Sequence, residues 1–146
     1  MARDVYTFTP VLETSILADD DVFFVPIEIP QVFDRGLARE LQSVVVLDGD
    51  DQNTDFDLFF FNATVTLGTL NAAVSISDAD AAKALGFVSM VAATHASDLI
   101  NSRLFMQNGI GLVMEGATAS LWVGGVVRSG TPTYTASGMK IKLGFI

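Results

Sequence analysis

Few residues of this 146-residue chain have the type and spacing that catalysis would need. His95 is the single histidine, and Ser97 and Asp98 follow it closely. A histidine acts as a general base when a carboxylate orients it and a nucleophile lies within hydrogen-bond reach, which adjacency in sequence does not establish. A loop histidine without a special role is the simpler interpretation. With one histidine and no cysteine, neither a cupin-type metal site nor a thiolate metal site is expected.

The acidic stretch 48–55 offers hard oxygen ligands of the kind that calcium prefers. It departs from the helix–loop–helix calcium signature at two positions. Asn53 stands where that signature needs glycine, and Phe59 stands where it needs glutamate. A solvated hairpin loop is the simpler interpretation, and calcium binding by this loop stays open.

Asp55 and Asp57 would point to the same side of a strand, an arrangement that could suit glycoside hydrolysis. A solvent-facing pair explains them more simply. The chain has no Gly-rich phosphate loop and no Gly-x-Ser-x-Gly nucleophile elbow. We therefore predict that the protein is not an enzyme and uses no metal or other cofactor.

Several large side chains are candidates for a protein–protein interface, because aromatic residues and arginine dominate the binding energy of such contacts. For each aromatic candidate, ordinary core packing is the alternative. The candidate interface residues are Phe59, Phe61, Phe105, Trp122 and Arg128.

The stretch 55–62 is the strand around which the chain is organised. Strict alternation puts Phe56, Leu58 and Phe60 on one face. The other face begins with aspartates and ends with Phe59 and Phe61. A strand that becomes covered on both sides is typical of the centre of a two-layer structure.

Other elements follow from alternation and from turn residues. One short helix is expected over about 78–85, capped by Ser77 and ended by Gly86. Residues 94–109 are expected to form a loop or a short strand. The other expected strands are 22–30, 36–48, 87–93, 111–115, 120–128 and 139–145. We expect 22–30 to be an edge strand, because its two prolines remove ladder donors, and 36–48 to pair with 55–62 as a hairpin. Within 120–128, Gly124-Gly125 indicates a close backbone approach.

Seven to nine short strands with one small helix predict an all-β fold, a jelly-roll-like β-sandwich. The length suits one domain, which we place at residues 22–146. Residues 1–21 are expected to form an extended N-terminal arm or edge strand that closes in the acidic turn 19–21.

Charge and hydropathy restrict the partners. The net charge is −9, and residues 1–57 hold 13 Asp/Glu against 3 Lys/Arg. Without clustered cations a nucleic-acid partner is not expected, and no apolar run approaches the ~20 residues of a membrane helix. A hydrophobic fraction of 50% and a mean hydropathy of +0.45 indicate either a very rich core or a contact with another chain. We favour the contact, and hence a homo-oligomer.

A set of short motifs in the second part of the chain has a characteristic order. They are 57–62 (Asp-Leu-Phe-Phe-Phe-Asn), 71–73, 77–80, Gly86, and 129–135 (Ser-Gly-Thr-Pro-Thr-Tyr-Thr) before a strand ending in Leu143-Gly144. Through these motifs the chain resembles, over about residues 36–146, the small head-decoration or cement proteins of tailed bacteriophages, which are virion structural proteins.

The resemblance implies a jelly-roll-like protein made in the host cytoplasm that assembles as a homodimer or homotrimer on the capsid exterior. There it would bind the major capsid protein and lock neighbouring capsid subunits. The alternative from another class is a sugar- or receptor-binding β-sandwich module of a phage tail or fibre. That function would need an exposed aromatic platform with polar neighbours, which Trp122 fits poorly because its neighbours are apolar.

Overall fold

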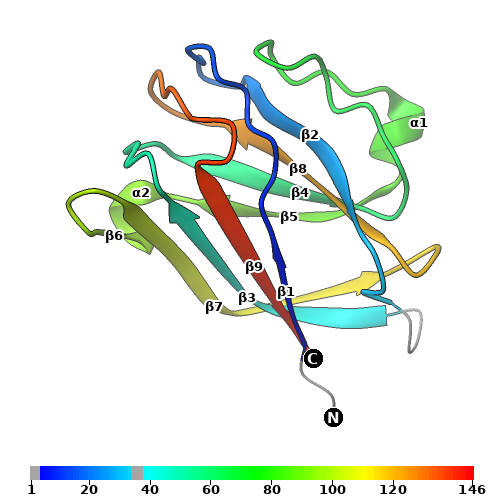
Figure 1. Ribbon diagram of the computed structural model, residues 1–146. Helices are drawn as coiled ribbons and strands as arrows, with labels where there is room; N and C mark the ends of the chain where they lie inside the picture. Colours follow the sequence, from blue (N-terminus) through cyan, green and yellow to red (C-terminus); the bar gives the residue numbers. More distant parts are fainter. Residues whose placement is uncertain (1–3, 34–37) are drawn as a thin grey trace.

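The structure, a computed structural model, describes residues 4–33 and 38–146. Two antiparallel sheets lie as two layers, with two single-turn helices at their margins (Figure 1). The elements in chain order are β1 (Asp4–Phe8), β2 (Val22–Ile29), β3 (Ala38–Asp48), β4 (Phe56–Phe61), α1 (Asp78–Ala81), β5 (Ala84–Met90), α2 (Ala92–His95), β6 (Ala96–Asp98), β7 (Arg103–Glu115), β8 (Leu121–Val127) and β9 (Met139–Phe145).

The strand order identifies the fold. One sheet has the order β1-β9-β3-β7-β6 and the other β2-β8-β4-β5. If the three-residue β6 is set aside, eight strands remain, and every chain connection except β4–β5 passes from one sheet to the other. Eight antiparallel strands divided in this way between two sheets form a jelly roll. The predicted all-β, jelly-roll-like β-sandwich is confirmed.

The main core lies between the two sheets. β4 contributes Phe56, Leu58 and Phe60, which alternation turns toward the five-stranded sheet. The ring of Phe56 meets the edge of Phe105 from β7, with 5.0 Å between the ring centroids. Such edge-to-face aromatic pairs add to the stabilisation that burial already provides. The core therefore joins the layers through the middle of β4.

A second, smaller core covers part of the outer face of the four-stranded sheet. Phe61 of β4 and Val126 of β8 pack there against Val65 and Leu67 from the connection 62–76. Because β4 is apolar on both faces and lies between β8 and β5, it is the central strand that the alternation predicted.

The hairpin predicted between the strands 36–48 and 55–62 is wrong. β3 pairs with β7 and β9, and β4 pairs with β5 and β8. Residues 49–55 therefore cross from one sheet to the other. Neighbouring strands in a sequence often pair, but a jelly roll places them in opposite layers. The start of the predicted strand at residues 36–37 lies outside the described residues.

The helix predicted over 78–85 is shorter than expected. α1 ends at Ala81, and Ser77 caps it by accepting a hydrogen bond from the Asp80 backbone N–H at 3.2 Å. Ala84 belongs instead to β5, where it pairs with Phe61. Pairing with the central strand thus overrides the helix propensity of the alanines.

Residues 94–109, predicted to be a loop or short strand, contain the end of α2, all of β6 and the first half of β7. β7 reaches 13 residues because β3 offers it a partner over almost its whole length. Because the side chains of this region are polar, the sequence did not indicate a strand there, and its extent depends on pairing with β3.

Two features of the four-stranded sheet follow from single residues. β2 is an edge strand, as its prolines predicted, and its pairing with β8 shifts register between Phe24 and Ile27, next to Pro26. The predicted close approach at Gly124-Gly125 is also confirmed. A Cβ on Gly125 would overlap the ring of Phe24.

The N-terminal segment begins with β1, which pairs with β9 at the edge of the five-stranded sheet. Residues 9–21 then cross the end of the sandwich beside the connection 128–138 (Figure 1). The N–H of Leu12 donates to the carbonyl of Ala136 at 2.9 Å, and the N–H of Leu17 donates to the carbonyl of Pro132 at 3.0 Å. Both leucine side chains are buried, which holds this segment against the domain. No helix in the described part of the chain could span a membrane.

The packing around Gly125 generates a prediction. Gly125→Ala should lower the free energy of unfolding by about 1–3 kcal/mol, because the added methyl group would overlap the buried rings of Phe23 and Phe24. Urea unfolding followed by circular dichroism measures this change. Gly109→Ala is the control, since its Cβ would meet nothing within 4 Å and only its φ of 63° costs about 1 kcal/mol. A Gly125→Ala variant as stable as the wild type would contradict the packing argument.

Candidate functional site

The residues around His95 form local structure rather than a catalytic arrangement. His95 Nδ1 accepts a hydrogen bond from the backbone N–H of Val91 at 2.8 Å, which closes the single turn of α2. Asp98 accepts from the backbone N–H of Ile100 at 2.8 Å and lies 3.8 Å from Arg103. The imidazole and the carboxylate are therefore directed to separate local contacts.

The side chains of the acidic loop fasten it to the turn 130–138. Asp50 accepts hydrogen bonds from the backbone N–H of Thr135 at 2.9 Å and from its hydroxyl at 3.0 Å. Gln52 accepts from the backbone N–H of Thr133 at 3.1 Å, and Asp51 forms an ion pair with Arg103 at 3.3 Å. In residues 4–33 and 38–146 no three His, Cys, Asp or Glu side chains converge as a metal site would require. The loop oxygens act as internal ties between two connections.

Asp48 is the buried member of this loop. Its side chain is fully buried, and its two oxygens accept hydrogen bonds from the backbone N–H groups of Asp50 at 2.9 Å and Gln52 at 2.8 Å. Burial raises the pKa of the Asp48 carboxyl to about 6, because it disfavours the charged form more than the two hydrogen bonds favour it.

Asp55 and Asp57 are likewise committed to internal contacts. Asp55 accepts from the backbone N–H of Ala92 at 2.8 Å. Asp57 accepts from the Ser89 hydroxyl at 2.6 Å and from Arg128 Nε at 2.8 Å. These contacts join the ends of strands in the four-stranded sheet and do not leave a carboxylate pair free for acid–base work.

Two of the predicted interface residues lie in the cores. Phe61 packs in the second core and Phe105 in the main core, each only 1% exposed, so neither presents a surface to a partner here. Trp122 is half-buried against the second core. The interface assignment of these aromatics from sequence could not separate core from surface, because that depends on which face each strand turns outward.

Phe59 and Arg128 form a cluster on the outer face of the four-stranded sheet. The ring of Phe59 stacks on Phe87 of β5 at 5.8 Å between centroids, and Arg128 Cζ lies 5.7 Å from the centre of the Phe59 ring. Arg128 also pairs with Asp20 at 2.6 Å as well as with Asp57. Phe87 is 59% exposed and is the part of this cluster that a partner could reach.

A larger surface, which the sequence did not reveal, is the outer face of the five-stranded sheet. On the adjacent strands β9, β3 and β7, the residues that alternate with the core residues point outward. We call this surface the lysine face and define it by Val45, Leu47, Leu104, Met106, Lys140 and Lys142. The alternation of the lysines with Met139, Ile141 and Leu143 was visible in the sequence, but the strands beside them were not.

The lysine face consists of two rows across the sheet. Val45 lies between Lys142 and Met106, and Leu47 lies between Lys140 and Leu104. A hollow of about 190 Å³ lies among the side chains of these rows.

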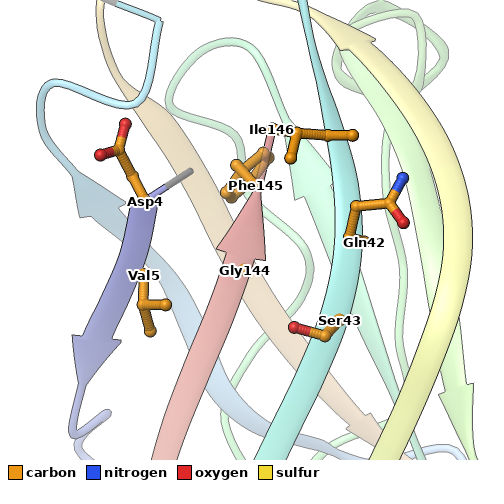
Figure 2. A pocket seen from close by; sticks show the side chains of 7 residues that line it. All are labelled: Asp4, Val5, Gln42, Ser43, Gly144, Phe145 and Ile146. Atoms are coloured by element: carbon orange, nitrogen blue, oxygen red, sulfur yellow. The ribbon is translucent and has the colours of Figure 1, made fainter. Parts of the chain in front are cut away.

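A third row continues the same surface and is hollowed because Gly144 has no side chain. Figure 2 shows Val5 and Ser43 on either side of Gly144, which pairs with both. The hollow at this row has a volume of about 340 Å³. The outer face of the five-stranded sheet is thus uneven and partly apolar across β1, β9, β3 and β7.

The two lysines of this face differ from the other cations of the described chain. The side chains of Arg39, Lys83, Arg103 and Arg128 each lie within ion-pair distance of an aspartate. Within the same part of the chain, neither Lys140 nor Lys142 has an acidic side chain within 4 Å. In a protein of net charge −9, two unpaired lysines beside apolar side chains make this face chemically distinct.

Comparison with known proteins gives no family assignment. No family model matches the chain, and no curated protein matches it. The structure of tomato aspermy virus is 12% identical, with a TM-score of 0.43 and coverage of 99% of this chain and 75% of that chain. The structure of Desmodium yellow mottle tymovirus is 12% identical to this chain, with a TM-score of 0.30, and the match covers 99% of this chain and 79% of that chain. The structure of infectious bursal disease virus, Gx strain, is 11% identical to this chain, with a TM-score of 0.21, and the match covers 99% of this chain and 38% of that chain.

The buried Asp48 generates a pH prediction. The folded protein binds this proton more tightly than the unfolded chain, so its contribution to stability is complete below pH 3.8 and is lost as the pH rises to about 6. The free energy of unfolding should fall by about 3 kcal/mol across this range from Asp48 alone. Urea unfolding of the wild type and Asp48→Asn at pH 4, 5, 6 and 7 isolates the effect as the difference between the two pH profiles. Parallel profiles would show that Asp48 does not titrate in this way.

Proposed function

We propose that this protein is a virion structural protein of the decoration or cement type, which binds the outside of an assembled phage head and stabilises it. The observation that carries the proposal is the lysine face. Residues 62–76 cover part of the outer face of the four-stranded sheet, whereas the described residues 4–33 and 38–146 leave the outer face of the five-stranded sheet open. An open sheet face with apolar side chains and unpaired lysines is suited to contact with other protein chains.

The physical demands of this role agree with the rest of the molecule. A ligand that binds only the assembled shell stabilises the shell by mass action, and this requires a rigid surface rather than a reactive group. The two-layer core and the ties between connections supply that rigidity. Homo-oligomeric contacts and contacts with the major capsid protein would share the binding, without catalysis.

The charge supports a position on the capsid exterior. A net charge of −9 disfavours contact with packaged nucleic acid, which attracts cationic proteins. The resemblance of residues 36–146 to head-decoration proteins of tailed bacteriophages supports the same location, with synthesis in the host cytoplasm.

The test is to add the purified protein to heads that lack it. The temperature at which the heads break open should rise with the concentration of added protein until the sites are filled, because binding favours the intact shell. Light scattering during heating measures the break, and heads mixed with heat-denatured protein are the control. An unchanged temperature at concentrations that saturate sedimentation binding, or no co-sedimentation at all, would contradict the proposal.

A sugar- or receptor-binding module of a tail or fibre is the second candidate, and one observation favours it. Phe87 is 59% exposed and stacks on Phe59, with Arg128 and Ser89 nearby as polar neighbours. An exposed aromatic ring of this kind can stack against the apolar face of a sugar. The polar neighbours are already engaged with Asp57, which leaves them few free donors.

A glycan array separates the two candidates. For the decoration role we expect no glycan signal above background, and the Phe87→Ala variant should bind heads as the wild type does. A glycan signal that Phe87→Ala abolishes, together with localisation of the protein on tails, would replace the decoration role with the receptor-binding role. Val25→Ala, which removes an exposed side chain on β2, is the matched control.

A further inference from the structure

We infer that the lysine face of one copy of this chain binds an acidic ridge on a second copy. The acidic ridge is defined by Val11, Glu13, Ile16 and Asp19 in the segment that follows β1. This deepens the proposed function by naming a self-contact, and it rests on that function only for the expectation that the protein is a homo-oligomer.

The lysine face supplies half of the complementarity. Met106 is 48% exposed and Leu47 38%, and cross-strand pairing joins them with Val45 and Leu104 in one contiguous apolar patch. Lys140 and Lys142 lie on β9, which is next to the β3 strand of Leu47 and two strands away from Met106 on β7. A partner for this surface must therefore bring apolar side chains to the hollow and carboxylates to its margin.

The acidic ridge has the opposite composition. Val11 is 75% exposed and Ile16 64%, although each is followed by a buried leucine. Glu13 and Asp19 lie beside them, and no cation of the described chain pairs with either. A glutamate carboxyl is charged at neutral pH, and the hydrogen bonds that Glu13 accepts from Ser15 and from the N–H of Thr14 lower its pKa further.

The ridge of one copy cannot cover the face of the same copy. Leu12 and Leu17 are buried, and their N–H groups bond to the connection 128–138, which fixes the ridge at the end of the sandwich. The segment that carries the ridge leaves the sheet at the margin of the face, because Thr9 lines a hollow together with Leu47 and Lys140. The ridge therefore follows the face closely along the chain and is held at the end of the sandwich.

The contact joins two different surfaces, so it can form in two ways. Made once between each pair of copies, it runs head to tail and builds a closed ring or a filament. Made twice in a two-fold dimer, it places the face of each copy on the ridge of the other. In both cases the charges on the two surfaces must be opposite, so charge reversal on each side separately tests the inference.

The experiment compares the oligomeric state of the wild type and three variants by sedimentation velocity at low salt. The wild type should sediment as a species heavier than the 15.6 kDa chain. The face variant Lys140→Glu/Lys142→Glu and the ridge variant Glu13→Lys/Asp19→Lys should each dissociate at a concentration at least about tenfold higher than the wild type, because each brings like charges together. The chain with all four substitutions should assemble again, since its charges are once more opposite.

A matched control changes the same number of acids away from the ridge. Asp78→Lys/Glu115→Lys replaces two exposed carboxylates and gives the same net charge as the ridge variant, and it should assemble as the wild type does. Circular dichroism spectra confirm that every variant is folded. Raising the salt concentration should weaken assembly of the wild type and of the fourfold variant alike.

Several results would overturn the inference. They are a monomeric wild type, a face variant that assembles normally, and a ridge variant that assembles while the face variant does not, since another occupant would then cover the face. Head binding by the same variants separates this failure from failure of the proposed function. If the protein binds heads but assembles through other residues, only the further inference is wrong. If it assembles as inferred but does not bind heads, only the proposed function is wrong.

Discussion

Burial of β4 on both of its faces is the constraint on which the rest of the structure depends. Phe56, Leu58 and Phe60 require a second sheet opposite them, and Phe61 requires a cover on the other side. Removing this apolar surface from water is the main favourable term in folding, so a strand of this composition must lie inside a layered structure. The jelly-roll connectivity meets both needs, because it brings β3, β7 and β9 to one side and leaves residues 62–76 for the other.

The placement of charge follows from the same packing. Where connections cross the ends of the sandwich, carboxylates would be costly to bury without partners. Asp57 meets Arg128 and Ser89, and Asp50 meets Thr135, so the acids of the first half of the chain hold distant segments together. The described arginines are used in these contacts, and Lys140 and Lys142 are left facing outward on β9.

The fold itself does not choose a function. Jelly rolls occur in viral capsid proteins, lectins and cupins, and their functions lie in the surfaces and sites that each chain builds on the scaffold. The two sheets of this chain differ: residues 62–76 cover part of the outer face of the four-stranded sheet, and no described segment covers the outer face of the five-stranded sheet. That inequality links the architecture to the proposed role in assembly and gives the acidic ridge a complementary surface to meet.

The sequence by itself determined the fold class and several local features. Alternation identified 55–62 and 139–145 as strands, Pro26 placed β2 at an edge, Ser77 marked the start of α1, and Gly124-Gly125 marked a close approach. Only the tertiary structure decided which strands pair, that Ala84 leaves the helix for β5, that Phe105 lies in the core, and that the rows beside Lys140 and Lys142 form an open face. Alternation and turn chemistry act between residues that are close in sequence, whereas strand pairing joins residues that are far apart, and the free energy of that pairing comes from packing that no single segment contains.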